Sequence, residues 1–168
     1  MFKKILIPTD GSPLANQAAF EGIALAKKVG AEVIGIYVAR ESQNPAFDFS
    51  DIPVKNQLSP EEYTEMVAKA GNALILPIRE AAEKEGVKFT AKIEISNTSA
   101  SRIVQAAEEN GCDMIFMGSQ GSAGWANMLL GSTAAKVVAL SQMPVTVYKV
   151  KKAQLPPKAK INIGILPV

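Results

Sequence analysis

The residues with the clearest chemical meaning lie between Gly118 and Ser132, where glycines recur at a fixed spacing. Two residues separate Gly118 from Gly121, and nine more lead to Gly131, which Ser132 follows. A strand-like apolar run enters this segment and a run with helical periodicity leaves it. Glycines at such a junction let backbone N–H groups approach a ligand, and a helix start adds unpaired donors and a positive dipole end. The segment is typical of a phosphate-binding loop, although glycine turns also form for conformational reasons alone.

A second polar segment, Pro8-Thr9-Asp10-Gly11-Ser12, follows the first apolar run of the chain. Asp10 has two interpretations: its carboxylate caps a turn or helix, or it accepts hydrogen bonds from ribose hydroxyls or an adenine amino group. A negative side chain is badly placed to contact phosphates. If this segment binds a nucleotide, Asp10 therefore belongs at the nucleoside end.

The elements that position both segments alternate between strand and helix patterns. Apolar runs predict five strands, over 4–9, 32–38, 87–96, 113–117 and 144–150. Helical periodicity predicts four helices, over 13–29, 60–85, 99–109 and 132–142. The second helix is expected to bury one face, made of Tyr63, Val67, Ala70, Leu74, Ile78 and Ala81. Residues 40–57 show no clear period and are expected to form a long loop.

This alternation predicts an α/β fold, with an open five-stranded, mostly parallel sheet sandwiched by about four helices in a Rossmann-like arrangement. Ligands of such sheets bind beyond the carboxyl ends of the strands, at the point where the strand order reverses. The segments at 8–12 and 118–132 both follow strands, so they meet at that edge. The presence of both segments at one edge of the sheet favours a ligand that contains phosphate.

The absence of histidine narrows the chemistry further, since the chain contains none. This excludes histidine acid–base catalysis, Ser-His-Asp and Cys-His nucleophiles, and zinc sites that need imidazole. No Gly-Lys pair occurs, so the P-loop signature is also absent. We therefore assign no catalytic residue and no metal ligand from the sequence.

Composition predicts one globular domain in the cytoplasm, with neither a nucleic acid nor a membrane as partner. The 168 residues are 48% hydrophobic and carry a net charge of +2 without a long block of one sign. Cys112 is the single cysteine and precedes a predicted strand, so it is expected to be a small buried residue. The start of the chain has too short an apolar run for a signal peptide, and no segment is long enough to span a membrane.

The residues of both segments, in this order, resemble the universal stress protein family and the glycine pattern of its ATP-binding branch. The resemblance covers about residues 2–150 and implies an adenine nucleotide alpha hydrolase-like fold. It implies that ATP, ADP or AMP, with or without Mg²⁺, binds here. Adenine and ribose would contact Pro8, Thr9, Asp10 and the backbone of Val38. The ribose and phosphates would contact Met117, Gly118, Ser119, Gln120, Gly121, Gly131, Ser132 and Thr133.

The chain departs from this family pattern at the phosphate end of the site. Members often carry a basic residue just before the second glycine and others within the spacer, whereas this chain has Gln120 and Ala126-Asn127. Affinity would then rest on backbone donors, the helix that begins at Ser132 and a metal. Weak binding of triphosphate, or a preference for AMP or ADP, follows as an alternative.

The resemblance also implies a homodimer, because the last strand of this family lies at the sheet edge and pairs antiparallel with its copy. Here that strand is expected over Pro144 to Val150. We divide the chain into a universal stress protein domain, 1–150, and a C-terminal linker with an apolar tail, 151–168. The tail docks on its own subunit, a partner subunit or another protein, and the sequence does not rank these.

The first functional hypothesis is a stress-response regulator whose conformation depends on a bound adenine nucleotide and is recognised by a downstream protein. Two alternatives remain open: a slow ATP hydrolase, and a dimeric interaction protein with no bound nucleotide. Phosphoryl transfer needs clustered cations and a group that orients water. The glycine segment shows neither, which places the hydrolase second.

Overall fold

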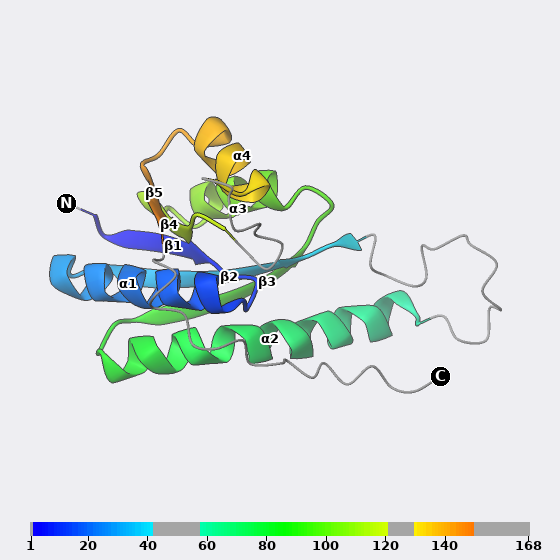
Figure 1. Ribbon diagram of the computed structural model, residues 1–168. Helices are drawn as coiled ribbons and strands as arrows, with labels where there is room; N and C mark the ends of the chain where they lie inside the picture. The colour runs from blue at the N-terminus through cyan, green and yellow to red at the C-terminus, as the bar shows by residue number, and fades with distance from the viewer. Residues whose placement is uncertain (1, 42–57, 121–129, 150–168) are drawn as a thin grey trace.

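The structure, a computed structural model, describes residues 2–41, 58–120 and 130–149, and confirms the predicted α/β fold (Figure 1). Strands and helices alternate along the chain. The strands are β1 (Lys4–Pro8), β2 (Glu32–Ala39), β3 (Phe89–Ile95), β4 (Met114–Gly118) and β5 (Val145–Tyr148). The helices are α1 (Pro13–Val29), α2 (Pro60–Lys84), α3 (Ser99–Glu109) and α4 (Ser132–Leu140).

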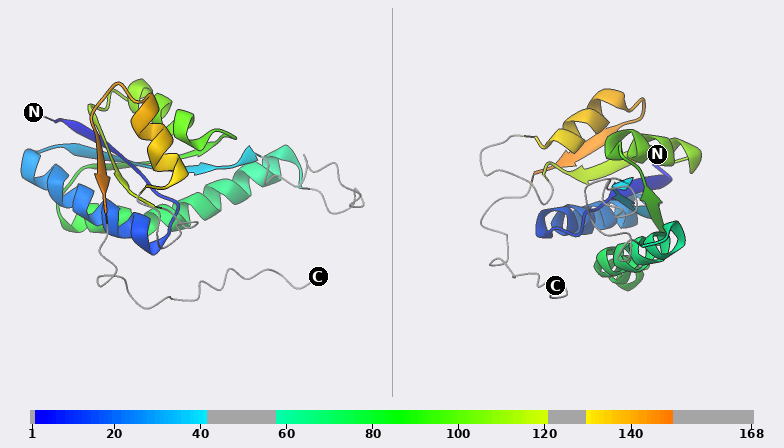
Figure 2. Two further views of the ribbon diagram at one scale, coloured as in Figure 1. Left: turned by 45° about the horizontal axis from the view of Figure 1, so that its top comes forward. Right: turned by 90° about the vertical axis from the view of Figure 1, so that its right-hand side faces the viewer.

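All paired strands run parallel, in the order β3-β2-β1-β4-β5. Helices α1 and α2 cover one face of the sheet, and α3 and α4 cover the other (Figures 1 and 2). The chain moves from β1 to β2 and β3 in one direction and then returns to place β4 on the other side of β1. The strand order therefore reverses between β1 and β4.

Strand β1 forms the centre of the core because side chains from both faces of the sheet pack against it. Ile5, Leu6 and Ile7 have no solvent-exposed surface. Leu6 faces a cluster with α3 and α4, whereas Ile5 and Ile7 face a cluster with α1 and α2. An uninterrupted apolar run is the pattern expected of a parallel strand that is covered on both faces.

The predicted helix starts have the expected geometry. The Ser12 hydroxyl accepts the Ala15 N–H at 3.2 Å at the start of α1. At the start of α2, the Ser59 hydroxyl accepts the Glu62 N–H at 3.1 Å, and the Glu62 carboxylate accepts the Ser59 N–H at 2.7 Å. This reciprocal capping box satisfies two donors that the helix itself leaves unpaired.

The buried face of α2 differs in part from the predicted one. Its buried positions are Tyr63, Val67, Gly71, Ile75, Ile78 and Ala82. Ala70 is exposed, and Leu74 and Ala81 are only half-buried. Gly71 takes the central position because a Cβ there would lie 2.9 Å from side-chain atoms of Tyr37 and Ile93. The apolar pattern did not predict a buried glycine. Because Gly71 has no side chain, α2 can lie close to the sheet at this position.

Cys112 lies just before β4 and is buried, as predicted. Burial raises the pKa of its thiol to about 11. Among the helices that the structure describes, none is both long and apolar enough to cross a bilayer.

Glu32, the first residue of β2, connects three strands at their amino ends. Its carboxylate lies 2.8 Å from the Lys4 ammonium of β1 and 2.7 Å from the Lys88 ammonium that precedes β3. These two partners, Lys4 first, hold the pKa of Glu32 below its usual value. The ion pairs reach solvent, so their contribution to stability is modest.

We expect the stabilising effect of Glu32 to disappear in acid. A lowered folded-state pKa contributes stability above the unfolded pKa, about 4.5, and this contribution is lost as the pH falls through the folded pKa. The melting temperature of Glu32→Gln should therefore lie below that of the parent near pH 7, and the difference should shrink toward about pH 3. Glu21→Gln, the same change on the exposed face of α1, is the matched control. A difference that stays constant with pH would contradict this role.

Candidate functional site

The carboxyl ends of β1, β2 and β4 lie side by side, and three of the predicted site residues stand there. Pro8 pairs with Ile36 in the β1–β2 register, and Val38 follows two residues later. On the other side Leu6 pairs with Ile115, so the same register continued to the strand end sets Pro8 beside Met117. Pro8, Val38 and Met117 therefore lie along one edge of the sheet, at the reversal of strand order.

The loop after β1 is held by its own polar groups. The Thr9 N–H donates to the Ile36 carbonyl oxygen at 2.9 Å. The Thr9 hydroxyl accepts the Gly11 N–H at 3.0 Å and lies 3.3 Å from the Asn16 amide oxygen. Because Thr9 is only 6% exposed and its hydroxyl is used within the loop, Thr9 shapes the site rather than presenting a side chain to it.

Asp10 is exposed at the tip of this loop. Its Oδ1 accepts the Ser12 N–H at 3.0 Å, which is the turn-capping geometry that the sequence offered as one interpretation. Its charge also reaches β2: burial raises the pKa of Tyr37, and the negative charge of Asp10 raises it further. Asp10 thus combines a local structural bond with an exposed position at the carboxyl edge of the sheet.

Gly118 is the last residue of β4 and the first glycine of the segment 118–132. A Cβ at Gly118 would lie 3.6 Å from the Leu14 carbonyl oxygen and 3.4 Å from the Ala18 Cβ, both in α1. It would also lie 3.3 Å from the carbonyl oxygen of Gln120, which is half-buried. The end of β4 therefore packs against the first turns of α1 at ordinary contact distances, directly behind the loop after β1, and only the Gln120 carbonyl oxygen would crowd a Cβ at Gly118.

Backbone hydrogen bonds join the two ends of the glycine motif. The Ser119 N–H donates to the Tyr148 carbonyl oxygen of β5 at 2.9 Å, and the Ser119 carbonyl oxygen accepts the Gly131 N–H at 2.7 Å. The start of α4 is thereby fixed beside the end of β4. Gly121 and the rest of the spacer, 121–129, lie outside the described residues.

Helix α4 begins at this point with an open amino end. Gly131 is its N-cap, and no side chain of the described part of the chain caps it. Ser132 and Thr133 are exposed in the first turn. The N–H groups of a first turn have no acceptor inside the helix, and they carry the positive end of its dipole. This arrangement can bind an anion.

Two contributors to the site were missed from the sequence. Leu130 is half-buried and packs against the same cluster as Met117 and Val38. Asn16 contacts the Thr9 hydroxyl from the first turn of α1. An apolar residue directly before the Gly131-Ser132 pair could have indicated the first contact, whereas nothing in the pattern distinguished Asn16.

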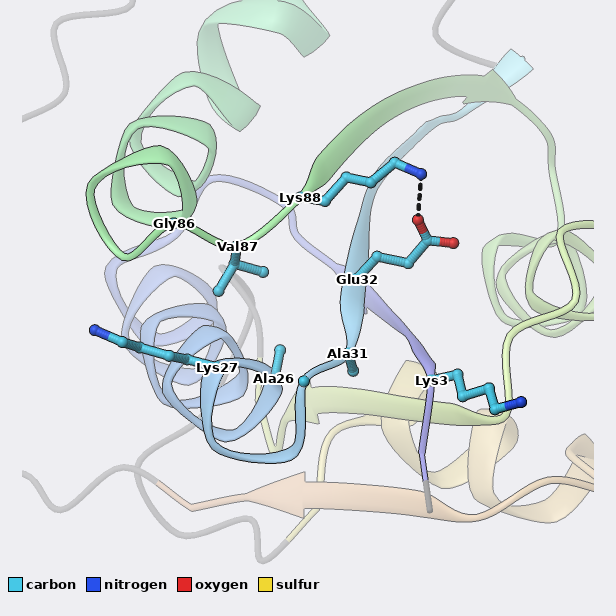
Figure 3. A pocket seen from close by; sticks show the side chains of 9 residues that line it. Lys3, Ala26, Lys27, Ala31, Glu32, Gly86, Val87 and Lys88 are labelled. Atoms are coloured by element: carbon cyan, nitrogen blue, oxygen red, sulfur yellow. Dashed lines mark ion pairs between the residues drawn. The ribbon is translucent and has the colours of Figure 1, made fainter.

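A separate groove of about 420 Å³ lies at the opposite, amino end of the sheet (Figure 3). Its lining includes Ala26, Ala31 and Val87, with Lys27 and Lys88 at the rim. Both lysines already form ion pairs, with Glu85 and Glu32 respectively, at 2.7 Å. A bound anion would have to compete with these carboxylates, so we assign no ligand to this groove.

Residues 1–149 match the family model described as "Universal stress protein family". The chain belongs to the universal stress protein family. It is 35% identical to universal stress protein MJ0531 of Methanocaldococcus jannaschii over 92% of this chain and 86% of that protein. It is 32% identical to universal stress protein MJ0577 of the same organism, over 91% of this chain and 98% of that protein.

Solved structures of universal stress proteins share the fold. The structure of MJ0577 superposes with a TM-score of 0.74 at 30% identity, covering 90% of this chain and 98% of that chain. A universal stress protein in complex with cAMP gives 0.61 at 17% identity, covering 89% and 98%. The Archaeoglobus fulgidus protein in complex with dAMP gives 0.55 at 17% identity, covering 88% and 97%.

The loop after β1 gives a test of how tightly the site is built. Gly11 has a φ of +74°, and a Cβ there would collide with the Leu74 side chain of α2. Gly30 has a φ of +71° but has nothing within 4 Å of such a Cβ. Gly30→Ala should therefore cost only the backbone strain, about 1 to 2 kcal/mol. Gly11→Ala should cost at least about 1 kcal/mol more, because overpacking adds to the strain.

A double-mutant cycle measured by urea unfolding isolates this contact. Leu74→Ala should remove most of the excess cost of Gly11→Ala, because it removes the Leu74 atoms beyond Cβ, and should leave the strain. Strictly additive costs for Gly11→Ala and Leu74→Ala would mean that α2 does not press on the loop.

Proposed function

We propose that this universal stress protein is a regulator that binds an adenine nucleotide at the carboxyl ends of β1, β2 and β4, with ATP as the first candidate. The observation that carries the proposal is that the loop after β1 and the described ends of the glycine motif, 118–120 and 130–133, lie at the reversal of strand order. The loop after β1 carries a carboxylate at its tip, and Gly131 begins α4 with no side-chain cap from the described residues. Sites of this construction suit a ligand with a polar nucleoside at one end and phosphate at the other.

The nucleoside lies between the loop after β1 and the end of β2. Pro8, Asp10 and Val38 surround adenine and ribose, Thr9 contributes through its backbone, and Met117 supplies an apolar wall. Family membership and the two proteins of the same fold that hold cAMP and dAMP support an adenine nucleotide as the class of ligand.

The phosphates lie against the glycine motif and the first turn of α4. Their donors are the backbone of Gly118, Ser119, Gln120, Gly121 and Gly131, with Ser132 and Thr133 at the helix start. Since the motif itself contains no Lys or Arg, charge neutralisation falls to the helix dipole and to Mg²⁺. Because so little positive charge faces the phosphates, AMP and ADP are the alternative candidate ligands to ATP.

Nucleotide binding should stabilise the folded protein measurably. Ligand at about one hundred times its dissociation constant adds about 2.7 kcal/mol, which for a chain of this size shifts the melting temperature by about 5 to 10 °C. Thermal melts with ATP, ADP and AMP, with and without Mg²⁺, check this directly. No shift with any of them at millimolar concentration would exclude the proposal.

A matched pair of glycine variants tests whether the glycine motif is responsible for the nucleotide-dependent rise in melting temperature. Gly131→Ala adds a methyl group 3.2 Å from the Ser119 carbonyl oxygen, so the free protein should melt at a somewhat lower temperature, and most of the nucleotide-dependent shift should be lost. Gly111→Ala, at the opposite end of the sheet with a φ of +62°, should lower the melting temperature of the free protein yet keep the full shift. Sustained phosphate release from ATP would instead favour the hydrolase alternative.

We also propose that the protein is a homodimer that pairs through β5 and its flanking residues, 144–150, although Val150 lies outside the described part. The Pro144 and Tyr148 carbonyl oxygens accept N–H groups of β4 and of Ser119. Because backbone groups alternate along a strand, those of Val145 and Val147 face the open edge. Pairing across a two-fold axis satisfies these groups.

Val147→Pro tests this dimer without disturbing the bonds to β4. Proline removes the outward N–H of Val147, and edge positions tolerate it. The variant should therefore be a folded protein that has lost the β5 dimer in light scattering, whereas Val147→Ala, which keeps the N–H, should retain it. If Val147→Pro and Val147→Ala dimerise equally, another surface holds the copies together.

A further inference from the structure

Strand β3 forms the other edge of the sheet, opposite β5 (Figure 2), and its outer side is unpaired in the described residues. It spans seven residues, whereas β5 spans four. Helix α2 packs against both β2 and β3, but α3 packs over β2. The face of β3 that carries Thr90, Lys92 and Glu94 is therefore left partly open.

The backbone of β3 presents a regular row of free groups along this edge. The Lys88 carbonyl oxygen accepts the Val33 N–H, and the Ser96 N–H donates to the Ala39 carbonyl oxygen, both at 2.8 Å. Alternation between these two bonds turns the backbone of even-numbered residues toward β2. The N–H and C=O groups of Ala91, Ile93 and Ile95 consequently face outward.

The side chains on the open face carry opposite charges two residues apart. Glu94 is half-buried, and its Oε1 lies 3.1 Å from the Arg102 guanidinium. None of the described residues bonds its Oε2. Lys92 is also half-buried and forms no ion pair within the described ranges. Charged side chains on an edge strand disfavour pairing with most other strands, but they favour pairing with a strand whose charges are complementary.

We propose that β3 pairs antiparallel with β3 of a second copy, around a two-fold axis at Ile93. In this register Lys92 lies opposite Glu94 of the second copy, and Glu94 lies opposite its Lys92. Ala91 and Ile95 form hydrogen-bonded pairs on either side of the central Ile93 pair. The pattern is self-complementary, as an isologous interface requires.

The charges select this register over its neighbours. An axis at Lys92 would place two lysines opposite each other, and an axis at Glu94 would place two glutamates opposite each other, both of which are unfavourable. An axis at Ala91 would pair Glu94 with Lys88, which is already bound to Glu32. The axis at Ile93 pairs Glu94 with Lys92, which forms no close ion pair within the described ranges and acts on Glu109 only through its charge.

The helices allow this approach. Since α2 lies over β2 and β3, the two copies of α2 would lie about two strand spacings apart, about 10 Å. This equals the usual distance between packed helices, about 8 to 10 Å. Leu74 lies on the side of α2 that faces the loop after β1. Residues two positions apart lie on nearly opposite sides of a helix. Leu76, which is 45% exposed, therefore lies on the side that would face the second copy.

Sedimentation velocity of the full chain from micromolar to millimolar concentration tests this interface in the Val147→Pro background, where the β5 edge is blocked. This protein should still form dimers as its concentration rises. Adding Lys92→Glu, which sets two glutamates opposite each other, should weaken the dimer at least about tenfold, or about 1.4 kcal/mol. Adding Lys88→Glu, the same charge change four residues away, should leave it unchanged.

A monomer at every concentration, or equal association with and without Lys92→Glu, would overturn the proposal. Hydrogen exchange on the unmodified protein gives a check that needs no variant. The amides of Ala91, Ile93 and Ile95 should exchange at least about tenfold more slowly at millimolar than at micromolar concentration. Exchange of these three amides that is independent of concentration would also overturn the proposal.

Discussion

The parallel pairing of β1 between β2 and β4 is the constraint on which the rest of the structure depends. β1 is buried on both faces, so its position fixes the layers of helices above and below. Because every strand runs in the same direction, all their carboxyl ends meet at one edge. The ends of β1 and β4, which are more than one hundred positions apart in the sequence, therefore become neighbours through the sheet alone.

Glycine at close approaches is the second recurrent device. A Cβ at Gly22 would lie 2.8 Å from Ile7 and 3.0 Å from Phe116, where α1 rests on the sheet. Gly71 does the same for α2 against Tyr37 and Ile93. These two glycines let α1 and α2 lie close to the sheet.

Much of the fold could be predicted because the apolar runs are long and capping residues such as Ser12 and Ser59 are clear. The observed strand ends differ from prediction by only one or two residues, as usual for strand boundaries. The buried face of α2 was partly wrong because the choice between Ala70 and Gly71 depends on Tyr37 and Ile93, which are distant in sequence. Local periodicity contains no information about such partners. The convergence of the two loops followed from topology, whereas the internal use of the Thr9 hydroxyl depends on the orientation of Asn16 and could not be predicted.

Cys112 limits how this protein can respond to its surroundings. Oxidants and electrophiles attack the thiolate form of cysteine, and a pKa of about 11 leaves roughly one molecule in ten thousand in that form at neutral pH. The chain has no second cysteine that could trap an oxidised sulfur as an internal disulfide. Thiol chemistry at Cys112 is therefore disfavoured while the protein is folded.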